Sequence, residues 1–139
     1  MRIVLDTNCL LVCLPKKSKY RPVFDAFLKN KFTLIVSNEI INEYAEIIGQ
    51  KTNAIIVTNV LELFVAHSNV EKAEVYYKWH LIKRDPDDNK FADCAIAGNA
   101  DFIVTNDKHF PDLKKVSFPI VKTITLDAFL KMIKKIKNE

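Results

Sequence analysis

The chain has 139 residues, of which 49% are hydrophobic and 27% are charged, as in an ordinary globular domain. Its two glycines and five prolines argue against a disordered or low-complexity chain. The formal net charge of +4 permits an acidic partner such as nucleic acid but does not require one. We expect a single domain over residues 1–139.

The sequence favours a cytoplasmic protein with no membrane partner. No apolar run approaches the roughly 18 residues needed to cross a membrane, and Asp6 interrupts the first apolar segment too early for a secretory signal. The three cysteines are an odd number at unremarkable spacing, which favours a reduced chain over a disulfide framework.

The first predicted strand covers residues 2–5, an apolar β-branched run that is typical of a central parallel strand. Asp6 follows at its carboxyl end, and Asn8 lies two residues further on. Asp and Asn are also common in turns after strands, so the position alone leaves the role of Asp6 open. A short helix over residues 10–14 is expected next.

A basic cluster separates this short helix from the next one. Most such clusters are solvated loops, but a cluster of this kind can also contact phosphates. Its members are Lys16, Lys17, Lys19 and Arg21. The following helix is expected to begin at Pro22, because the fixed φ of proline suits the first turn.

A second strand is predicted over residues 32–36. Ser37 is expected to cap a helix over residues 38–48, which Gly49 would end. On this helix Glu43 lies at the margin of the apolar stripe, where an acid is often simply solvated. The helix follows a strand, so its beginning should face the same end of the sheet as the carboxyl end of the first strand.

The middle of the chain is less regular. A helix over residues 52–67 has a broad apolar surface that suits either the core or a subunit contact. Residues 69–80 give the least certain pattern. Their rings could stack on RNA bases, or could fill the core or a dimer interface. The residues concerned are Tyr76, Tyr77, Trp79 and His80.

The next predicted helix covers residues 88–97, with Asp88 as its N-cap and Gly98 at its end. The preceding loop also contains Asp85 and Asp87, which we leave unassigned. The helix is apolar almost all round and should be buried.

Asp93 lies in the middle of this helix, and burying a lone carboxylate costs several kcal/mol unless it is paired or bound to metal. A strand over residues 102–105 follows, with Asp107 at its carboxyl end, where open α/β sheets bind ligands. A last strand over residues 120–124 and a final helix capped by Thr125 complete the chain.

The order of these elements predicts an α/β sandwich, a three-layer α/β/α arrangement with a mostly parallel central sheet. Right-handed crossovers would bring four acids to one edge of that sheet. They are Asp6, Glu43, Asp93 and Asp107. Four neighbouring carboxylates repel one another, and Mg²⁺ or Mn²⁺ resolves that conflict because these ions prefer oxygen ligands.

Three segments of the chain resemble the PIN domain family, and specifically its VapC-like toxin branch from bacterial and archaeal toxin–antitoxin systems. They are IVLDTN, SNEIINEYAEII and DPDDNKFADCAIAGNADFIVTND. The resemblance implies a PIN-like fold and a Mg²⁺- or Mn²⁺-dependent ribonuclease that hydrolyses RNA. It also implies a cognate antitoxin as a partner and a homodimer.

The resemblance further assigns roles to individual residues. It places the metal ligands at Asp6, Asp93 and Asp107, while Glu43 ligates the metal or orients the attacking water. Less specific supporting positions fall on Asn8, Ser37, Thr105 and Asp88.

Two other functions compete with a nuclease. A non-catalytic module that binds RNA or protein would keep the fold without turnover. A phosphotransfer domain of the receiver type is less compatible, because Asp6 has no neighbouring acid and Lys122 falls inside the predicted last strand.

Overall fold

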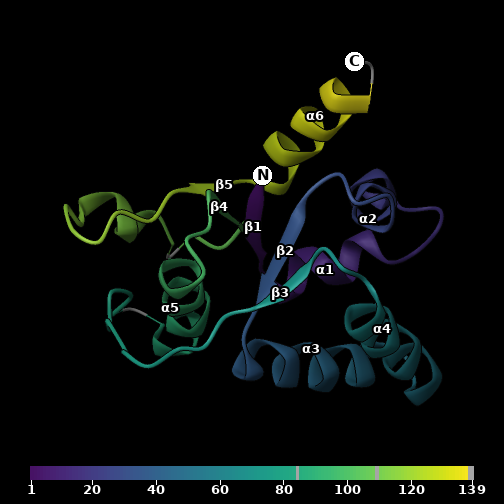
Figure 1. Cartoon of the computed structure of the whole chain (residues 1–139), viewed down its shortest axis with the longest axis horizontal. Helices are drawn as coiled ribbons and strands as arrows, with labels where there is room; N and C mark the ends of the chain where they lie inside the picture. Colours follow the sequence, from purple (N-terminus) through teal and green to yellow (C-terminus); the bar gives the residue numbers. More distant parts are fainter. Residues whose placement is uncertain (84, 109, 138–139) are drawn as a thin grey trace.

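The computed structural model describes residues 1–83, 85–108 and 110–137. Its centre is a five-stranded sheet in the order β3-β2-β1-β4-β5, in which every neighbouring pair is parallel (Figure 1). The strands are β1 (Arg2–Leu5), β2 (Thr33–Val36), β3 (Val70–Lys72), β4 (Phe102–Val104) and β5 (Thr123–Ile124). The predicted α/β class is therefore confirmed, and the sheet is parallel throughout.

The strand β1 occupies the middle of the sheet, as its apolar run predicted. Ile3 pairs with Leu34 of β2 on one side and with Phe102 of β4 on the other. Ile3 and Val4 are fully buried, because helices cover both faces of a parallel sheet. The edge strand β3 was not predicted, since Val70 is its only apolar residue.

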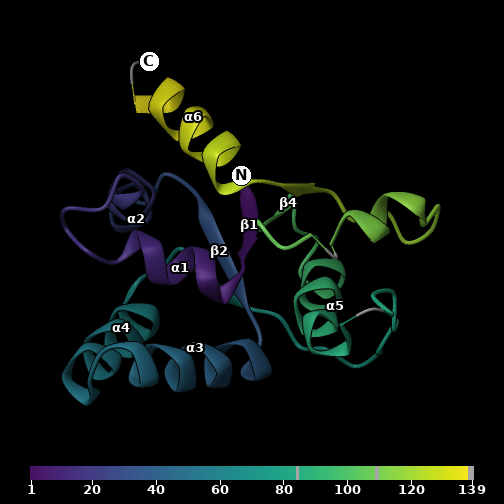
Figure 2. The ribbon, with the colours of Figure 1, turned by 180° about the vertical axis from the view of Figure 1, so that it is seen from behind.

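Six α-helices and two 3₁₀ helices surround the sheet in the described part of the chain. They are α1 (Thr7–Cys13), α2 (Arg21–Leu28), α3 (Asn38–Lys51), α4 (Ala54–Ala66), η1 (Pro86–Asp88), α5 (Asn89–Ala97), η2 (Phe110–Lys115) and α6 (Leu126–Lys137). The helix α2 packs against α1 and α6, α3 packs against α4, and α5 packs on β1 and β4 (Figures 1 and 2). Right-handed crossovers on the two sides of β1 place α5 on the opposite face of the sheet from α1–α4.

Two predicted helix boundaries are wrong. The helix predicted over residues 10–14 already begins at Thr7, because Asp6 is extended in the N-cap position and its carbonyl accepts the N–H of Leu10 at 3.0 Å. The third helix does not end at Gly49 but continues to Lys51. The cap predicted at its start is confirmed, since the Ser37 hydroxyl accepts the N–H of Ile40.

The helix α5 also begins differently from the prediction. Asp88 belongs to η1 and makes no side-chain capping bond, so its predicted role as an N-cap is wrong. Gly98 does end the helix, but the left-handed residue is Asn99, with φ 53°. Gly98 is required because a Cβ there would lie 2.5 Å from Cγ2 of Ile35 on β2.

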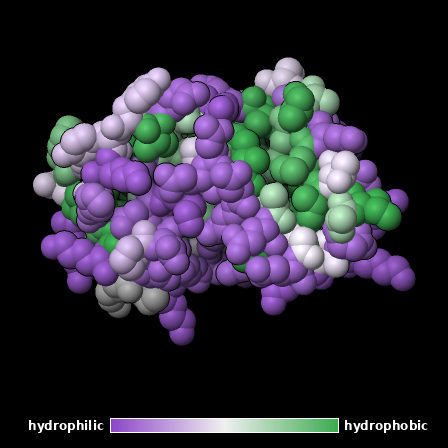
Figure 3. Space-filling model, turned by 90° about the horizontal axis from the view of Figure 1, so that it is seen from below, coloured by the Kyte–Doolittle hydropathy of each residue, from purple (hydrophilic) through white to green (hydrophobic). Residues whose placement is uncertain are grey.

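The helix α4 leaves much of its apolar surface uncovered. Only Val60 and Phe64 are buried, whereas Ile55 and Val65 are 72% and 89% exposed. Figure 3 shows a hydrophobic patch on the side of the molecule where α4 lies. The apolar surface of this helix was predicted to suit either the core or a subunit contact. Only a small part of it lies in the core.

Within the described residues, every helix is too short or too polar to span a lipid bilayer.

Candidate functional site

Acidic residues gather at the carboxyl edge of the sheet, between β1 and β4. From β1 the chain builds outward through β2 to β3, and it then returns on the other side of β1 as β4. Ligands of open α/β sheets bind at such a reversal of strand order, because the loops on either side diverge and leave room. Asp6 follows β1 at this point, and Asp107 follows β4.

One threonine hydroxyl ties these two acids together. The hydroxyl of Thr105 donates to Oδ2 of Asp6 at 2.8 Å and accepts the backbone N–H of Asp107 at 3.0 Å. Burial raises the pKa of Asp6, and the negative charges of Asp107 and Glu43 raise it further, although the bond from Thr105 acts in the opposite direction. Asp6 therefore lies in an environment that disfavours its ionised form unless a cation is present.

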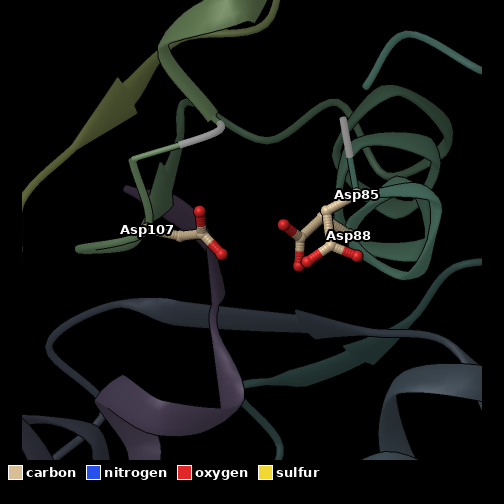
Figure 4. A group of neighbouring side chains, drawn as sticks. All are labelled: Asp85, Asp88 and Asp107. Atoms are coloured by element: carbon tan, nitrogen blue, oxygen red, sulfur yellow. The ribbon is translucent and has the colours of Figure 1, made fainter. Parts of the chain in front are cut away.

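Three further carboxylates face one another beside this pair. One oxygen each from Asp85, Asp88 and Asp107 lies within 4.8 Å of the others. In Figure 4, Asp107 faces Asp85 and Asp88, which come from the segment immediately before α5. The three acids thus join the end of β4 to the beginning of α5.

Asp88 is the most perturbed acid of this group. It is 9% exposed, and within the described residues its Oδ2 is buried with no hydrogen-bond partner. Burial raises its pKa to about 8, with further contributions from a hydrogen bond to Asp107 and from the charges of Asp107, Asp85 and Asp6. Burial beside other carboxylates therefore disfavours the ionised form of Asp88 unless a cation is present.

The donor set suits a hard divalent cation. All ligands are carboxylate oxygens, which Mg²⁺ and Mn²⁺ prefer, whereas zinc sites favour nitrogen and sulfur. Two ligands on opposite sides of Mg²⁺ lie about 4.2 Å apart, so oxygens that lie within 4.8 Å of one another are near the required range. The buried Oδ2 of Asp88 is an acceptor without a hydrogen-bond partner in the described residues, and a bound cation would satisfy it.

Glu43 lies next to this group on α3 and is fixed from both sides. Thr7 donates its hydroxyl to Oε2 of Glu43, and Nζ of Lys90 lies 2.7 Å from Oε1. Burial lowers the pKa of Lys90, but the bond to Glu43 and the negative charges of nearby acids together outweigh that effect, and the net shift is upward. The charge of Glu43 also acts on Asp6, so the predicted proximity of these two acids is present in the structure.

Asp93 does not lie with the other acids. It is 5% exposed, and its Oδ1 accepts the backbone N–H of Trp79 at 3.0 Å. Burial raises its pKa, and the charged groups that act on it are His80, Glu39 and Lys78.

The geometry of the helix explains this separation. Asp93 follows Asp88 by five residues, which corresponds to about 140° around a helix and about 7.5 Å along it. The predicted convergence of Asp93 with Asp6, Glu43 and Asp107 is therefore not what the structure shows. Asp88 lies with them instead.

The remaining predicted residues divide between the site and other places. Thr105 is within the site, whereas Asn8 is exposed on α1 and Ser37 caps α3. The basic cluster lies beyond the carboxyl end of α1, about 10 Å along the helix from Asp6. Two of its members form ion pairs, Lys19 with Asp127 at 3.4 Å and Arg21 with Asp25 at 2.9 Å. The predicted contact of this cluster with RNA stays a prediction.

From the sequence, Asp85 was left unassigned and Asp88 was given only a supporting position, although the structure groups both with Asp107. The signal was present, because the beginning of a crossover helix lies at the same edge as the carboxyl ends of the strands. That argument placed Glu43 correctly, and applied to α5 it favours the acids just before the helix over Asp93.

In open parallel α/β sheets, ligands bind at the carboxyl edge where the strand order reverses, and the clustered carboxylates of this chain lie at that edge. A family model described as a PIN domain matches residues 2–109. The chain therefore belongs to the PIN domain family. The matched region includes all the acids described at the carboxyl edge of the sheet.

Solved structures support the same fold. The crystal structure of VapBC2 from Rickettsia felis, bound to a DNA fragment from their promoter, matches with a TM-score of 0.62 and 21% sequence identity. That match covers 90% of this chain and 98% of the other. The PIN domain of RRP44 from T. brucei matches with a TM-score of 0.55 and 11% identity, covering 98% of this chain and 82% of the other. A search of curated proteins gave no match.

Proposed function

We propose that this protein is a ribonuclease that depends on a divalent metal and hydrolyses phosphodiester bonds in RNA. The observation that carries the proposal is the group of Asp85, Asp88 and Asp107 with a buried, unpartnered oxygen on Asp88. Membership of the PIN domain family supports it. Mg²⁺ or Mn²⁺ is the cation that this donor set favours.

The acids have distinct roles in this proposal. Asp88 and Asp107 hold the cation, with Asp85 beside them, and Asp6 is oriented toward it through the hydroxyl of Thr105. A bound metal lowers the pKa of water and offsets the negative charge of a phosphate.

Glu43 acts from the other side of the site. Its carboxylate is held by Thr7 and Lys90, so it is a positioning residue for the attacking water. Asp93 is instead assigned to holding the backbone of Trp79 in place.

Protein partners belong to the same proposal. The resemblance to VapC-like toxins and the likeness to VapBC2 support a cytoplasmic toxin controlled by a cognate antitoxin. The three cysteines are free and buried, which is compatible with a reducing compartment. The exposed apolar face of α4 offers a surface for a homodimer. Light scattering of purified protein tests the dimer, and Val65→Asp should shift it to the monomer.

The test of the proposed activity is cleavage of a mixed-sequence single-stranded RNA with Mn²⁺ or Mg²⁺. Asp88→Asn should abolish cleavage, since it removes a ligand while preserving the shape of the side chain. Asp93→Asn is the matched control, because it makes the same change on a buried acid of the neighbouring helix. EDTA should also stop the reaction.

The outcomes separate the competing functions. Loss of cleavage in Asp88→Asn and in EDTA, with activity kept in Asp93→Asn, supports the metal site described above. Loss in Asp93→Asn with activity kept in Asp88→Asn would restore the assignment made from the sequence. RNA binding that EDTA does not change, with no turnover at any metal concentration, would favour the non-catalytic module.

A further inference from the structure

A cluster of three aromatic rings lies on the surface next to α5. The rings of Tyr77 and Trp79 meet with centroids 4.7 Å apart and planes at 65°, and those of Trp79 and Phe118 meet at 6.1 Å and 82°. Tyr77 is 64% exposed and Phe118 is 79% exposed. The cluster joins two segments that are far apart in the sequence, and the proposed chemistry uses neither of them.

This aromatic cluster is connected to the proposed metal site through α5. The backbone N–H of Trp79 donates to Asp93 in the middle of that helix. Ile82 and Asn89 are joined by two hydrogen bonds, of 2.8 and 3.0 Å, between the backbone of Ile82 and the amide of Asn89. Asn89 directly follows Asp88, so the same segment fixes the rings and approaches the acid group.

A hollow of about 200 Å³ lies beside the connecting segment. Lys78, His80 and Lys90 contribute to its wall, together with acids and a proline. Lys78 lies 4.0 Å from Glu39 and remains exposed. The lining mixes acids with lysines, and among them Lys78 is the exposed cation adjacent to Trp79 in the sequence.

The segment that carries Phe118 is also basic. Residues 113–126 contain lysines but no acid. These lysines, which are all exposed, are Lys114, Lys115 and Lys122. Cationic groups beside open aromatic rings suit a phosphate backbone with unpaired bases.

We propose that the aromatic cluster is a stacking platform for an unpaired base of single-stranded RNA, which it holds while the backbone extends toward the acid group. The proposal rests on the proposed ribonuclease function and adds a surface that holds a base away from the acid group. Tyr77 and Phe118 keep most of their surface exposed, so parts of both rings are accessible to a base. The bases of a duplex already stack on each other and are not free to bind in this way.

A second copy of the chain is the other occupant to consider. A surface that pairs two protein chains is expected to be depleted in lysine, whereas this cluster lies among exposed lysines. The exposed apolar face of α4 is aliphatic and better suited to a protein contact.

The experiment uses the fact that Trp79 is the only tryptophan of the chain. In EDTA, where hydrolysis does not interfere, a single-stranded RNA of mixed sequence is titrated into the protein and tryptophan fluorescence is followed. Stacking of a base should quench the emission, and a duplex of the same sequence should quench it far less. Phe118→Ala should weaken binding by about 5- to 150-fold, the range for the loss of one base–aromatic contact.

The matched control is Val65→Ala, which removes exposed apolar surface from α4 and should leave RNA binding unchanged. Tyr77→Ala provides a second variant of the cluster, and circular dichroism checks that each variant is folded. Unquenched emission, or equal affinity of Phe118→Ala and the unmodified protein, would overturn the proposal. A dimer that Phe118→Ala dissociates would overturn it in favour of a second copy.

Failure of this proposal can be told apart from failure of the ribonuclease proposal. Metal-dependent cleavage without quenching leaves the nuclease in place and removes the stacking platform. Quenching without cleavage under any metal condition leaves an RNA-binding surface and removes the enzyme. The two readouts do not depend on each other, because the fluorescence titration contains no metal.

Discussion

Replacing Asp88 by Asn should remove most of the electrostatic penalty at the proposed metal site. The wild-type acid has a pKa of about 8 in the folded protein, mainly because of burial, and 3.8 is its ordinary value. A raised pKa means that the folded state holds a proton that the unfolded state releases. The contribution to stability is therefore complete below about pH 4 and declines as the pH rises toward 8.

The size of the effect follows from this pH window. One titrating group changes the free energy of unfolding by at most about 1.4 kcal/mol per pH unit. Between pH 5 and 7.5 the free energy of unfolding of the wild type should thus fall by about 2 to 3 kcal/mol. The Asp88→Asn variant lacks the titrating group and should not show this fall. For 139 residues this corresponds to about 7 to 10 °C in Tm. Asn can still donate a hydrogen bond to Asp107, so the variant should fold normally.

Thermal unfolding in EDTA at the two pH values measures this difference. A second series with Mg²⁺ or Mn²⁺ at pH 7.5 should raise the Tm of the wild type but hardly that of Asp88→Asn, because the ligand is missing. Asp93→Asn is the control and should keep the metal response.

A single result would refute the reasoning. If the Tm difference between the wild type and Asp88→Asn is the same at both pH values, Asp88 titrates as an ordinary surface acid. The surroundings of Asp88 would then not disfavour its ionised form, and this support for a cation at the acid group would be lost.

Three further substitutions test the packing and polar contacts described above. Gly98→Ala should destabilise the protein by about 1 to 3 kcal/mol in urea unfolding, because the new Cβ would overlap Ile35; unchanged stability would contradict that close approach. Gly49→Ala is its matched opposite and should stabilise by about 0.4 to 1 kcal/mol, since the added Cβ has only an ordinary contact at 3.5 Å and lies within a helix. Thr105→Val should lower the rate of RNA cleavage by about 10-fold or more, because Asp6 loses its orienting hydroxyl; full activity would remove Thr105 from the site.

The sheet was predictable because its strands are short, buried apolar runs with polar residues at their ends. The position of β1 at the centre followed from the apolar run over residues 3–5. The edge strand β3 was missed because only Val70 is apolar and its pairing is provided by the backbone of β2. The predicted helix ends were wrong where the sequence is compatible with two structures. At Gly49, for example, α3 continues without interruption.

The candidate site was only partly predictable, and Asp93 shows why. The sequence argument held that a buried carboxylate needs a cation. The structure satisfies it with the backbone N–H of Trp79, from a segment without regular structure. Periodicity carries no information about such a contact. The position of Asp88 depends in turn on η1, whose tight turn directs the acids before α5 toward the end of β4.

The place of β1 between β2 and β4 also has a consequence for synthesis on the ribosome. Its partner β2 begins at residue 33, but β4 begins only at residue 102. At about 5 to 20 residues per second, β1 waits about 5 to 20 s for its second neighbour. Asp107 is added later still, so a nascent chain carries no complete set of acids until about three quarters of the protein has been made. The unfinished chain would therefore lack the proposed nuclease activity while it is still attached to the ribosome.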